Sequence, residues 1–408
     1  MTIDADVAIS GGGVVGTTLA LALAGGGLSV LLLDKSTVRD RRSDEFDGRA
    51  YALSLSSCRI LGSLGLSALL KESGQEFRSV CITDGRAGEG ASPSVLRFDA
   101  GDLQDGPMAT MIEDRFLRRA LLDLVAAMPS ICHRSPAEMS SFRTGPSDVQ
   151  LRLESGENFT ASMIAGCDGR NGPVARDFAT SRVTRDYRQS ALVCAVEHDL
   201  PHAGCACQFF MPTGPLAILP LPQNRSSIVW TDTTDNADRM MALSDEDFMQ
   251  ELRLRFGDFL GRLKLASRRY CWPLSLSLAE TTAAERSVLV GDAALGLHPL
   301  AGQGLNLGLR DVASLAETLI HACRRGEDIG EAGVLRRYQD WRRLDLNSFA
   351  FATDFLNWIF SNDSEPLRQL RRAGMQFVNS TPMLRRSLVR HAAGIAGDIP
   401  TLANGRAI

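Results

Sequence analysis

A glycine-rich turn near the start of the chain holds the first residues whose types and spacing indicate chemistry. Gly11, Gly13 and Gly16 lie between a short apolar segment and an alanine-rich one, and Asp34 ends the next apolar segment. Such glycines let the backbone approach a pyrophosphate that faces a helix N-terminus. Asp34 is placed to accept adenosine ribose hydroxyls, and its charge disfavours a 2′-phosphate. The turn predicts an adenine dinucleotide, NAD or FAD, unless its glycines serve only packing.

A second glycine-rich stretch, 291–306, begins with Gly-Asp directly after an apolar segment. Asp292 is an acceptor placed to hold sugar-alcohol hydroxyls. Gly302 and Gly304 leave room for a flat ring against bare backbone. The helix that follows would aim N–H groups at that ring, which suits the negative charge of a reduced flavin. A plain strand–turn–helix connection is the alternative, but this stretch favours FAD over NAD.

A third turn, 166–173, reads Gly-Cys-Asp-Gly-Arg-Asn-Gly-Pro and follows another strand-like segment. Asp168 in this turn is either a further cofactor contact or part of an ordinary Asp-Gly turn. The residues leave both interpretations open.

The elements that must position these turns are predicted from the apolar patterns. A β-α-β unit spans 6–34, with a strand at 7–9, a helix at 14–23 and a strand at 29–33. We also expect a helix at 114–127, loops at 85–93 and 101–107, and a long helix after Gly302. Residues 331–394 are expected to be mostly helical. From 188 to 278 the pattern predicts antiparallel strands with one helix, at 244–256. The expected strands are 191–196, 208–211, 216–221, 227–231 and 269–276.

Composition sets further bounds. The 408 residues carry a net charge of −4, which gives no electrostatic case for nucleic acid. Nine dispersed cysteines indicate reduced thiols in a cytosolic compartment, and the six histidines are not at metal-ligand spacing, so no metal is expected. We expect no signal peptide and no membrane span, because the N-terminus is acidic and no long apolar run occurs.

Together, the three turns resemble the motifs of class A flavoprotein monooxygenases. Within that family the chain is similar to the ubiquinone-biosynthesis hydroxylases (the 2-polyprenylphenol/6-methoxyphenol hydroxylase family). The stretches that carry this likeness are 47–54, 187–191, 214–221 and, most specifically, 298–311.

The resemblance implies an α/β fold like that of hydroxybenzoate hydroxylase. A Rossmann-like FAD-binding domain would be formed by 1–75, 100–180 and 280–335. An inserted, mainly antiparallel β-sheet substrate domain would be formed by 76–99 and 181–279, and a C-terminal helical region by 336–408.

The resemblance also implies roles for individual residues. Those that would bind the cofactor are Gly11, Gly13, Val15, Gly16, Asp34, Lys35, Arg49, Arg115, Asp168, Asp292, Pro299, Gly302, Gly304, Leu305 and Asn306. Those at the catalytic centre would be His298, Pro299, Gly302 and Gln303. The chain departs from the family pattern at three positions, with Leu295 in place of His, Gly172 in place of Ser and Ala175 in place of Arg.

The implied reaction is hydroxylation of a polyprenylated phenol through a C4a-hydroperoxide of the flavin. FAD is the implied cofactor and O₂ the co-substrate, with electrons from NAD(P)H or a separate reductase. A phenol titrates near pH ~10, so an acceptor for its proton would help. His298 and Tyr187 are the candidates, although His298 fits a core role equally well.

The C-terminal region suggests where such an apolar substrate is met. Residues 349–360 are rich in Phe, Trp and Leu, and 365–391 contain six arginines against one glutamate. These segments either contact a membrane surface or a biosynthetic complex, or pack on the core with a solvated basic face. We therefore expect a cytoplasmic protein, peripheral to the inner membrane in the first case. A homo-oligomer is compatible with the sequence.

Two other functions stay open at this point. A soluble NAD(P)H-dependent hydroxylase of a small aromatic acid would need a buried cation in the sheet domain, where Arg188 and Arg225 occur. A flavin-binding or non-catalytic subunit of a biosynthetic assembly would explain the three departures as loss of activity.

Overall fold

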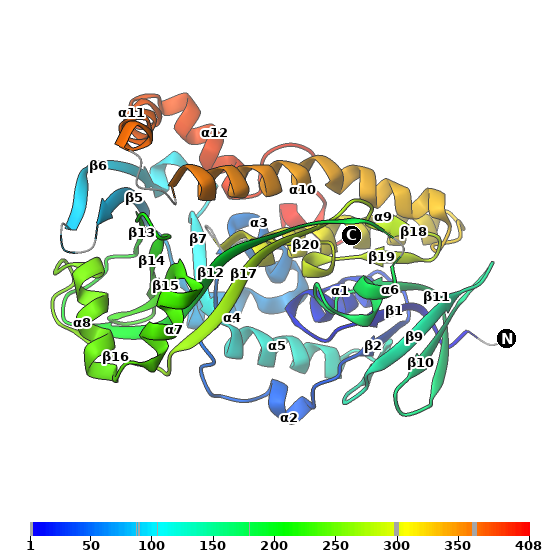
Figure 1. The fold of residues 1–408 in the computed structure, drawn as a ribbon. Helices are drawn as coiled ribbons and strands as arrows, with labels where there is room; N and C mark the ends of the chain where they lie inside the picture. Colours follow the sequence, from blue (N-terminus) through cyan, green and yellow to red (C-terminus); the bar gives the residue numbers. More distant parts are fainter. Residues whose placement is uncertain are drawn as a thin grey trace.

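The computed structural model describes residues 3–86, 88, 90–103, 105–178, 180–297, 302–360 and 365–408. Figure 1 shows a smaller sheet on the right, a long sheet that crosses the molecule to the left, and the C-terminal helices along the top.

An eight-stranded sheet holds the first and third turns. Its centre is parallel, in the order β19-β11-β1-β2-β8. Val7, Ile9 and Leu32 have no exposed surface, as expected for parallel strands covered by helices. The strands are β1 (Ala5–Ser10), β2 (Val30–Leu33), β8 (Ile131–Arg134), β11 (Asn158–Gly166) and β19 (Ser287–Leu289), with antiparallel β9 (Met139–Thr144), β10 (Val149–Leu153) and β18 (Ala283–Ala284).

The main core lies between this sheet and its helices. α1 is buried on nearly every side and packs against α9, which explains its apolar sequence. The helices of this part are α1 (Val14–Gly25), α2 (Val38–Arg41), α3 (Leu55–Leu61), α4 (Ser67–Ser73), α5 (Asp114–Ala127), α6 (Pro173–Asp177) and α9 (Gln303–Arg324). A small antiparallel sheet, β3-β7-β4, lies beside them; its strands are β3 (Ala50–Ser54), β4 (Gln75–Glu76) and β7 (Ala109–Glu113).

A second, nine-stranded sheet has the order β20-β17-β12-β15-β14-β13-β5-β6, with β16 beside β12. Its side chains alternate between two faces, as strand geometry requires. Ile218, Ile228 and Trp230 pack under two helices, whereas Leu219 and Val229 face a cavity. The elements are β5 (Ser79–Arg86), β6 (Gly90–Asp99), β12 (Arg182–His198), β13 (Cys205–Phe210), β14 (Leu216–Leu221), β15 (Arg225–Thr233), β16 (Leu263–Leu265), β17 (Tyr270–Ala279) and β20 (Leu295–Gly296), with α7 (Thr234–Ala242) and α8 (Asp245–Phe256).

The loop prediction for 85–93 is wrong in part, because β6 begins at Gly90. Gly85 pairs with Ala91 across the hairpin, so tertiary pairing overrides the weak strand propensity of this stretch. β6 lies at the sheet edge, where Pro93, which lacks an N–H, is tolerated. The sequence also failed to predict α7. The fold class is confirmed, whereas the domain boundaries stay a prediction.

Three C-terminal helices, α10 (Ala332–Phe360), α11 (Glu365–Ser380) and α12 (Pro382–Ala392), lie along one side of the molecule (Figure 1). Ion pairs attach the last two: Arg372 to Asp84 at 3.4 Å, Arg385 to Asp102 at 2.8 Å, and Arg390 to Asp105 at 2.9 Å. Within the described part of the chain, no helix is long and apolar enough to cross a membrane.

Candidate active site

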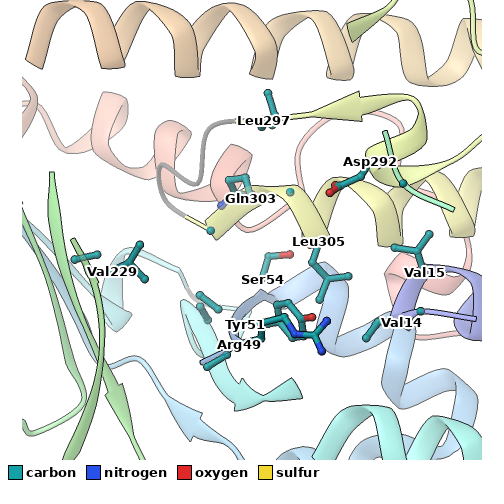
Figure 2. A pocket seen from close by; sticks show the side chains of 18 of the residues that line it. Val14, Val15, Arg49, Tyr51, Ser54, Val229, Asp292, Leu297, Gln303 and Leu305 are labelled. Carbon is teal, nitrogen blue, oxygen red and sulfur yellow. The ribbon is translucent and has the colours of Figure 1, made fainter. Parts of the chain in front are cut away.

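A cavity of about 1450 Å³ brings the three turns together. Gly13, Asp168 and Asp292, one from each turn, all line it. Its walls continue over the second sheet and the C-terminal helices. In Figure 2, Leu297, Gln303 and Asp292 lie above Tyr51 and Arg49, with Val229 at the left and Val14 at the right.

The first turn combines tight packing with one open position. Gly11 has φ +108°, and a Cβ there would lie 2.4 Å from the Cys167 carbonyl oxygen. A Cβ on Gly16 would lie 1.9 Å from the Gly11 carbonyl oxygen. Gly13, at the N-cap of α1, has no heavy atom within 4 Å of its Cβ position, and no side chain caps the helix. The free N–H groups beside this open space would suit an anion.

Asp34 is buried at the cavity wall and already has partners. Arg41 donates to both carboxylate oxygens, at 2.7 and 2.9 Å, and the Ser36 N–H donates at 3.0 Å. These three bonds leave about one of the roughly four lone-pair sites of a carboxylate. A ribose hydroxyl would therefore share Asp34 with Arg41. Lys35 is exposed and also lines the cavity.

The second turn faces the cavity with Asp292 and the start of α9. The Asp292 carboxylate is open to the cavity. Burial by the surrounding protein raises the pKa of Asp292, and the charge of Arg170 offsets part of this rise. A Cβ on Gly304 would lie 3.9 Å from Asp292 Oδ1. Gly302, with φ +60°, begins α9 without a side-chain cap, and the first turn of the helix has no acidic residue. This helix end therefore also offers free N–H groups.

Asp168 is fixed on one side only. Its Oδ2 accepts from Ser10 Oγ at 3.1 Å and from the Val174 N–H at 2.9 Å. Its Oδ1 is buried and has no hydrogen-bond partner among the described residues. Burial raises the pKa of Asp168, and the two hydrogen bonds offset part of this rise. A buried acceptor without a partner is costly, so it marks a place where a ligand donor would fit.

Arg49 and Tyr51 form the wall opposite Asp292. Arg49 pairs with Asp47 and, at 3.1 Å, with Asp114, to which the Tyr51 hydroxyl donates at 2.9 Å. Burial and the charge of Asp114 raise the pKa of Tyr51, so it stays a neutral hydroxyl. Sequence reasoning identified Arg49 but missed Tyr51.

Most of the predicted cofactor residues line this cavity. Those that do are Gly11, Gly13, Val15, Asp34, Lys35, Arg49, Asp168, Asp292, Gly302, Gly304 and Leu305, together with Gln303 from the predicted catalytic set. His298 and Pro299 lie outside the described residues.

Three predicted cofactor residues do not line the cavity. Gly16 packs against Gly11. Arg115 donates to Glu113 at 2.7 Å and to the Asp44 carbonyl at 2.6 Å. The Asn306 side chain accepts from the Ser54 N–H at 2.9 Å and donates to the Ala52 carbonyl at 2.9 Å, which ties α9 to β3. Their direct contact with a cofactor stays a prediction.

Comparison with known proteins identifies this arrangement. A family model described as "FAD binding domain" matches residues 4–345, most of the chain. The chain belongs to the FAD binding domain family. It is 41% identical over 404 residues to the ubiquinone hydroxylase UbiL of Rhodospirillum rubrum, covering 98% of this chain and 93% of that protein. It is 31% identical to the 3-demethoxyubiquinol 3-hydroxylase of Escherichia coli K12, covering 96% and 98%.

The fold agrees with this membership. The crystal structure of p-nitrophenol 4-monooxygenase PnpA from Pseudomonas putida DLL-E4 superposes with a TM-score of 0.79, covering 97% of this chain and all of that chain. The identity is only 19%, so this likeness shows the fold alone. This member of the FAD binding domain family is a flavin-dependent monooxygenase, and its fold is that of the hydroxybenzoate-hydroxylase type.

The residues of this FAD binding domain fit the cofactor. The uncapped α1 terminus and the space at Gly13 suit a pyrophosphate, and Asp34 suits the adenosine ribose. Asp292 and the α9 terminus would hold the flavin half, and Asp168 Oδ1 still lacks a donor among the described residues. When bound, FAD supplies the reaction with O₂ that hydroxylates a ring.

The three departures from the family pattern have structural explanations. Leu295 is buried in an apolar cluster with Leu276, Leu307 and Leu346 and does not line the cavity. At Gly172, a Cβ would lie 2.0 Å from Asp168 Cγ, so a serine could not occupy this backbone with Asp168 in its present place. Ala175 is buried in the core, whereas Arg176, the next residue, lines the cavity.

A buried ion-pair network behind the second turn escaped sequence reasoning. Asp311 accepts from the Gly291 N–H at 3.0 Å and from Arg342 at 2.6 Å. Arg342 also pairs with Asp345 at 2.5 Å, and Asp345 with Arg310 at 3.1 Å. The network thus fixes the backbone just before Asp292. The adjacent Arg310 and Asp311 were the sequence signal for this network. Arg342 could not be linked to them, because it lies 31 residues after Asp311 in the sequence.

The two glycines of the first turn predict opposite results for the same mutation. Gly13→Ala should leave the melting temperature of the FAD-free protein almost unchanged but weaken FAD binding, because the new methyl fills the anion space. Gly16→Ala should destabilise the FAD-free protein, because its Cβ meets backbone that cannot move without separating α1 from the sheet. Thermal unfolding and FAD titration separate the two. Equal loss of stability in both variants would contradict this interpretation.

Proposed function

We propose that this flavoenzyme hydroxylates the aromatic ring of a polyprenylated phenol in ubiquinone biosynthesis. The observation that carries the proposal is the apolar wall of the cavity beyond the flavin residues. Phe77, Ile82, Leu96, Phe210 and Val229 all belong to it. The names of the relatives from R. rubrum and E. coli support the same substrate class.

A small aromatic acid is less well supported as the substrate. The sheet offers no cation to the cavity from the two expected candidates: Arg225 pairs with Glu113 at 2.9 Å, Arg188 is exposed, and neither lines it. Among the described residues of the C-terminal helices that line the cavity, Arg371 of α11 is the charged one. A non-catalytic subunit is also less well supported, because the departures leave the turns and both helix ends in place.

The protein's own contribution to this reaction is position, dryness and a proton acceptor. The apolar wall excludes water from the ring, and Asn306 fixes the start of α9 beside it. Tyr187 does not line the cavity, and its hydroxyl donates to Asp354 at 3.1 Å, so we assign it to the attachment of α10. His298 is our remaining candidate for the phenol proton. Electrons would come from NAD(P)H or from a separate reductase.

The function is tested by deleting the gene and analysing quinone precursors by mass spectrometry. We expect a prenylated phenol lacking one ring hydroxyl to accumulate, and the purified protein to be yellow with stoichiometric FAD. An unchanged quinone pool would refute the assignment, and a colourless protein that FAD does not reconstitute would refute a catalytic role.

We further propose that the protein contacts the membrane through its C-terminal helices, and that this contact is mainly apolar. Arg372, Arg385 and Arg390 pair with the protein's own carboxylates, which reduces the charge available to lipid. Several large apolar side chains on these helices are exposed, namely Leu344, Phe351, Leu370, Phe377 and Met383.

The Phe377→Asp/Met383→Asp variant should therefore lose flotation with phosphatidylcholine vesicles, because each aspartate puts a charge into the apolar contact. Leu254→Asp, at an exposed leucine of α8, is the matched control and should float like the parent. High salt should have little effect on the parent protein. Binding only to anionic vesicles, abolished by salt, would contradict an apolar contact.

A further inference from the structure

The cavity extends well past the residues that would hold FAD. One wall of this extension comes from β5 and β6, and the other from α11 and α12. We call it the tail lobe and define it by its apolar lining: Val80, Ile82, Leu96, Phe98, Leu370, Met375, Val378, Leu388 and Val389. Its walls therefore suit an apolar ligand.

The tail lobe opens to the surface between α11 and α12. Leu370 and Leu388 line it, yet they are 59% and 44% exposed. Met375 and Val389, which also line it, are each 5% exposed and lie inside. The lobe thus runs from a buried interior to an apolar mouth, so a long ligand could occupy it and still reach the solvent or a bilayer.

Ion pairs, contact with β6 and a small apolar cluster attach the two helices that cover the lobe. The ion pairs to Asp84, Asp102 and Asp105 lie around the cover. A small cluster that includes Val389 and Ile395 also joins α12 to the core, and Arg310 donates to the His391 carbonyl at 3.4 Å. α11 lies against β6, and residues of both elements line the cavity between them, including Met375 and Phe98. A cover held in this way leaves room for an extended ligand between helix and sheet.

We infer that the tail lobe binds a prenyl chain along its length, with the ring at the Gln303 end and the chain passing out between α11 and α12. This rests on the proposed function for the identity of the ring. Apart from Arg371, the described lining that the C-terminal helices add is apolar, which suits a flexible hydrocarbon. The consequence is that residues of α11, remote from the flavin turns, set the preference for tail length.

Gly374 is the residue that makes this testable. It lines the cavity near the mouth, and a Cβ there would meet no heavy atom within 4 Å. Gly374 is also exposed, so a larger side chain at this helical position can narrow the mouth of the lobe without displacing the protein. Ala373, the adjacent residue, is exposed and does not line the cavity. Gly374→Trp and Ala373→Trp thus add the same bulk at the mouth of the lobe and outside it.

The first measurement is binding of geranylgeraniol, a prenyl alcohol without a ring, to the FAD-loaded protein by isothermal titration calorimetry. We expect binding to the parent and to Ala373→Trp, and an affinity at least about tenfold lower in Gly374→Trp, equivalent to about 1.4 kcal/mol. Equal affinity in the two tryptophan variants, or no binding to the parent, would overturn the inference.

The second measurement compares kcat/KM for phenols that carry one isoprene unit and eight. Gly374→Trp should lower the value for the long substrate and leave the short one unchanged, whereas an equal loss for both would overturn the inference. Failure of the proposed function is distinguishable, because the parent would then bind geranylgeraniol but hydroxylate neither phenol.

Discussion

Replacing Asp292 with asparagine should give a folded protein that purifies with little FAD. Asp292 is the acidic side chain that the second turn presents to the cavity, close to the start of α9 and its free N–H groups. A hydrogen bond to a charged group contributes about 1.5–3 kcal/mol, so its loss should weaken FAD binding by roughly 10- to 150-fold. Titration of the FAD-free protein with FAD, followed by flavin fluorescence, measures this change.

The same substitution should stabilise the FAD-free protein at neutral pH. Burial raises the pKa of Asp292, so the folded state binds its proton more tightly than the unfolded chain does. A carboxyl group whose pKa is higher in the folded state than in the unfolded chain destabilises the fold when the pH is above the folded-state pKa. This destabilisation disappears as the pH falls toward the pKa that the group has in the unfolded chain. Asparagine carries no charge and removes the cost.

An unfolding series in urea from about pH 5 to 8 tests this opposition between stability and binding. The gain in free energy of unfolding of Asp292→Asn over the parent should be largest at the highest pH of the series. Asp258→Asn, at an exposed aspartate outside the cavity, is the control and should change neither property. Parent-like FAD affinity in Asp292→Asn would show that the second turn does not hold the cofactor through this carboxylate.

The parts of the site that sequence predicted are those whose signal is local. In 5–34 the strand, the glycine turn and the helix follow one another, so apolar pattern and glycine spacing sufficed. The start of α9 at Gln303 was equally clear, because Gly302 precedes a long apolar stripe. In each case the determinants lie within one element and its flanking turn.

The parts that sequence did not predict depend on contacts between distant segments. β5 pairs in parallel with β13, with Ser79 beside Cys205, and this pairing puts a second apolar wall on the cavity. The hydrogen-bond partners of Asn306 in 52–57 lie between 249 and 254 residues away along the chain. Nothing in the local pattern of 365–392 shows that α11 and α12 cover the cavity. Residue type shows that a side chain is apolar or charged, but not which distant surface it meets.

Replacing Arg342 with methionine should destabilise the protein more than any other single change considered above. Arg342 and Asp311 are both buried and joined at 2.6 Å. Removing one partner of a buried ion pair leaves an uncompensated charge, at a cost of about 3–5 kcal/mol. Because Asp311 also holds the Gly291 N–H, FAD affinity should fall as well. Urea unfolding and FAD titration measure the two effects, with the exposed neighbour variant Arg343→Met as the control.

The pH dependence of the Arg342→Met variant identifies the cause of its instability. Burial already raises the pKa of Asp311, and the charge of Arg342 is the main influence that lowers it. Without Arg342 the pKa should rise further, so the folded state takes up a proton as the pH falls and the unfolded chain does not. The stability gap to the parent should therefore narrow from about pH 8 to 5. The double variant Asp311→Asn/Arg342→Met, which has no stranded charge, should recover much of the loss at pH 8. A gap that is independent of pH and unaffected by Asp311→Asn would mean that Arg342 acts through packing of its side chain, and that the carboxylate of Asp311 does not need it.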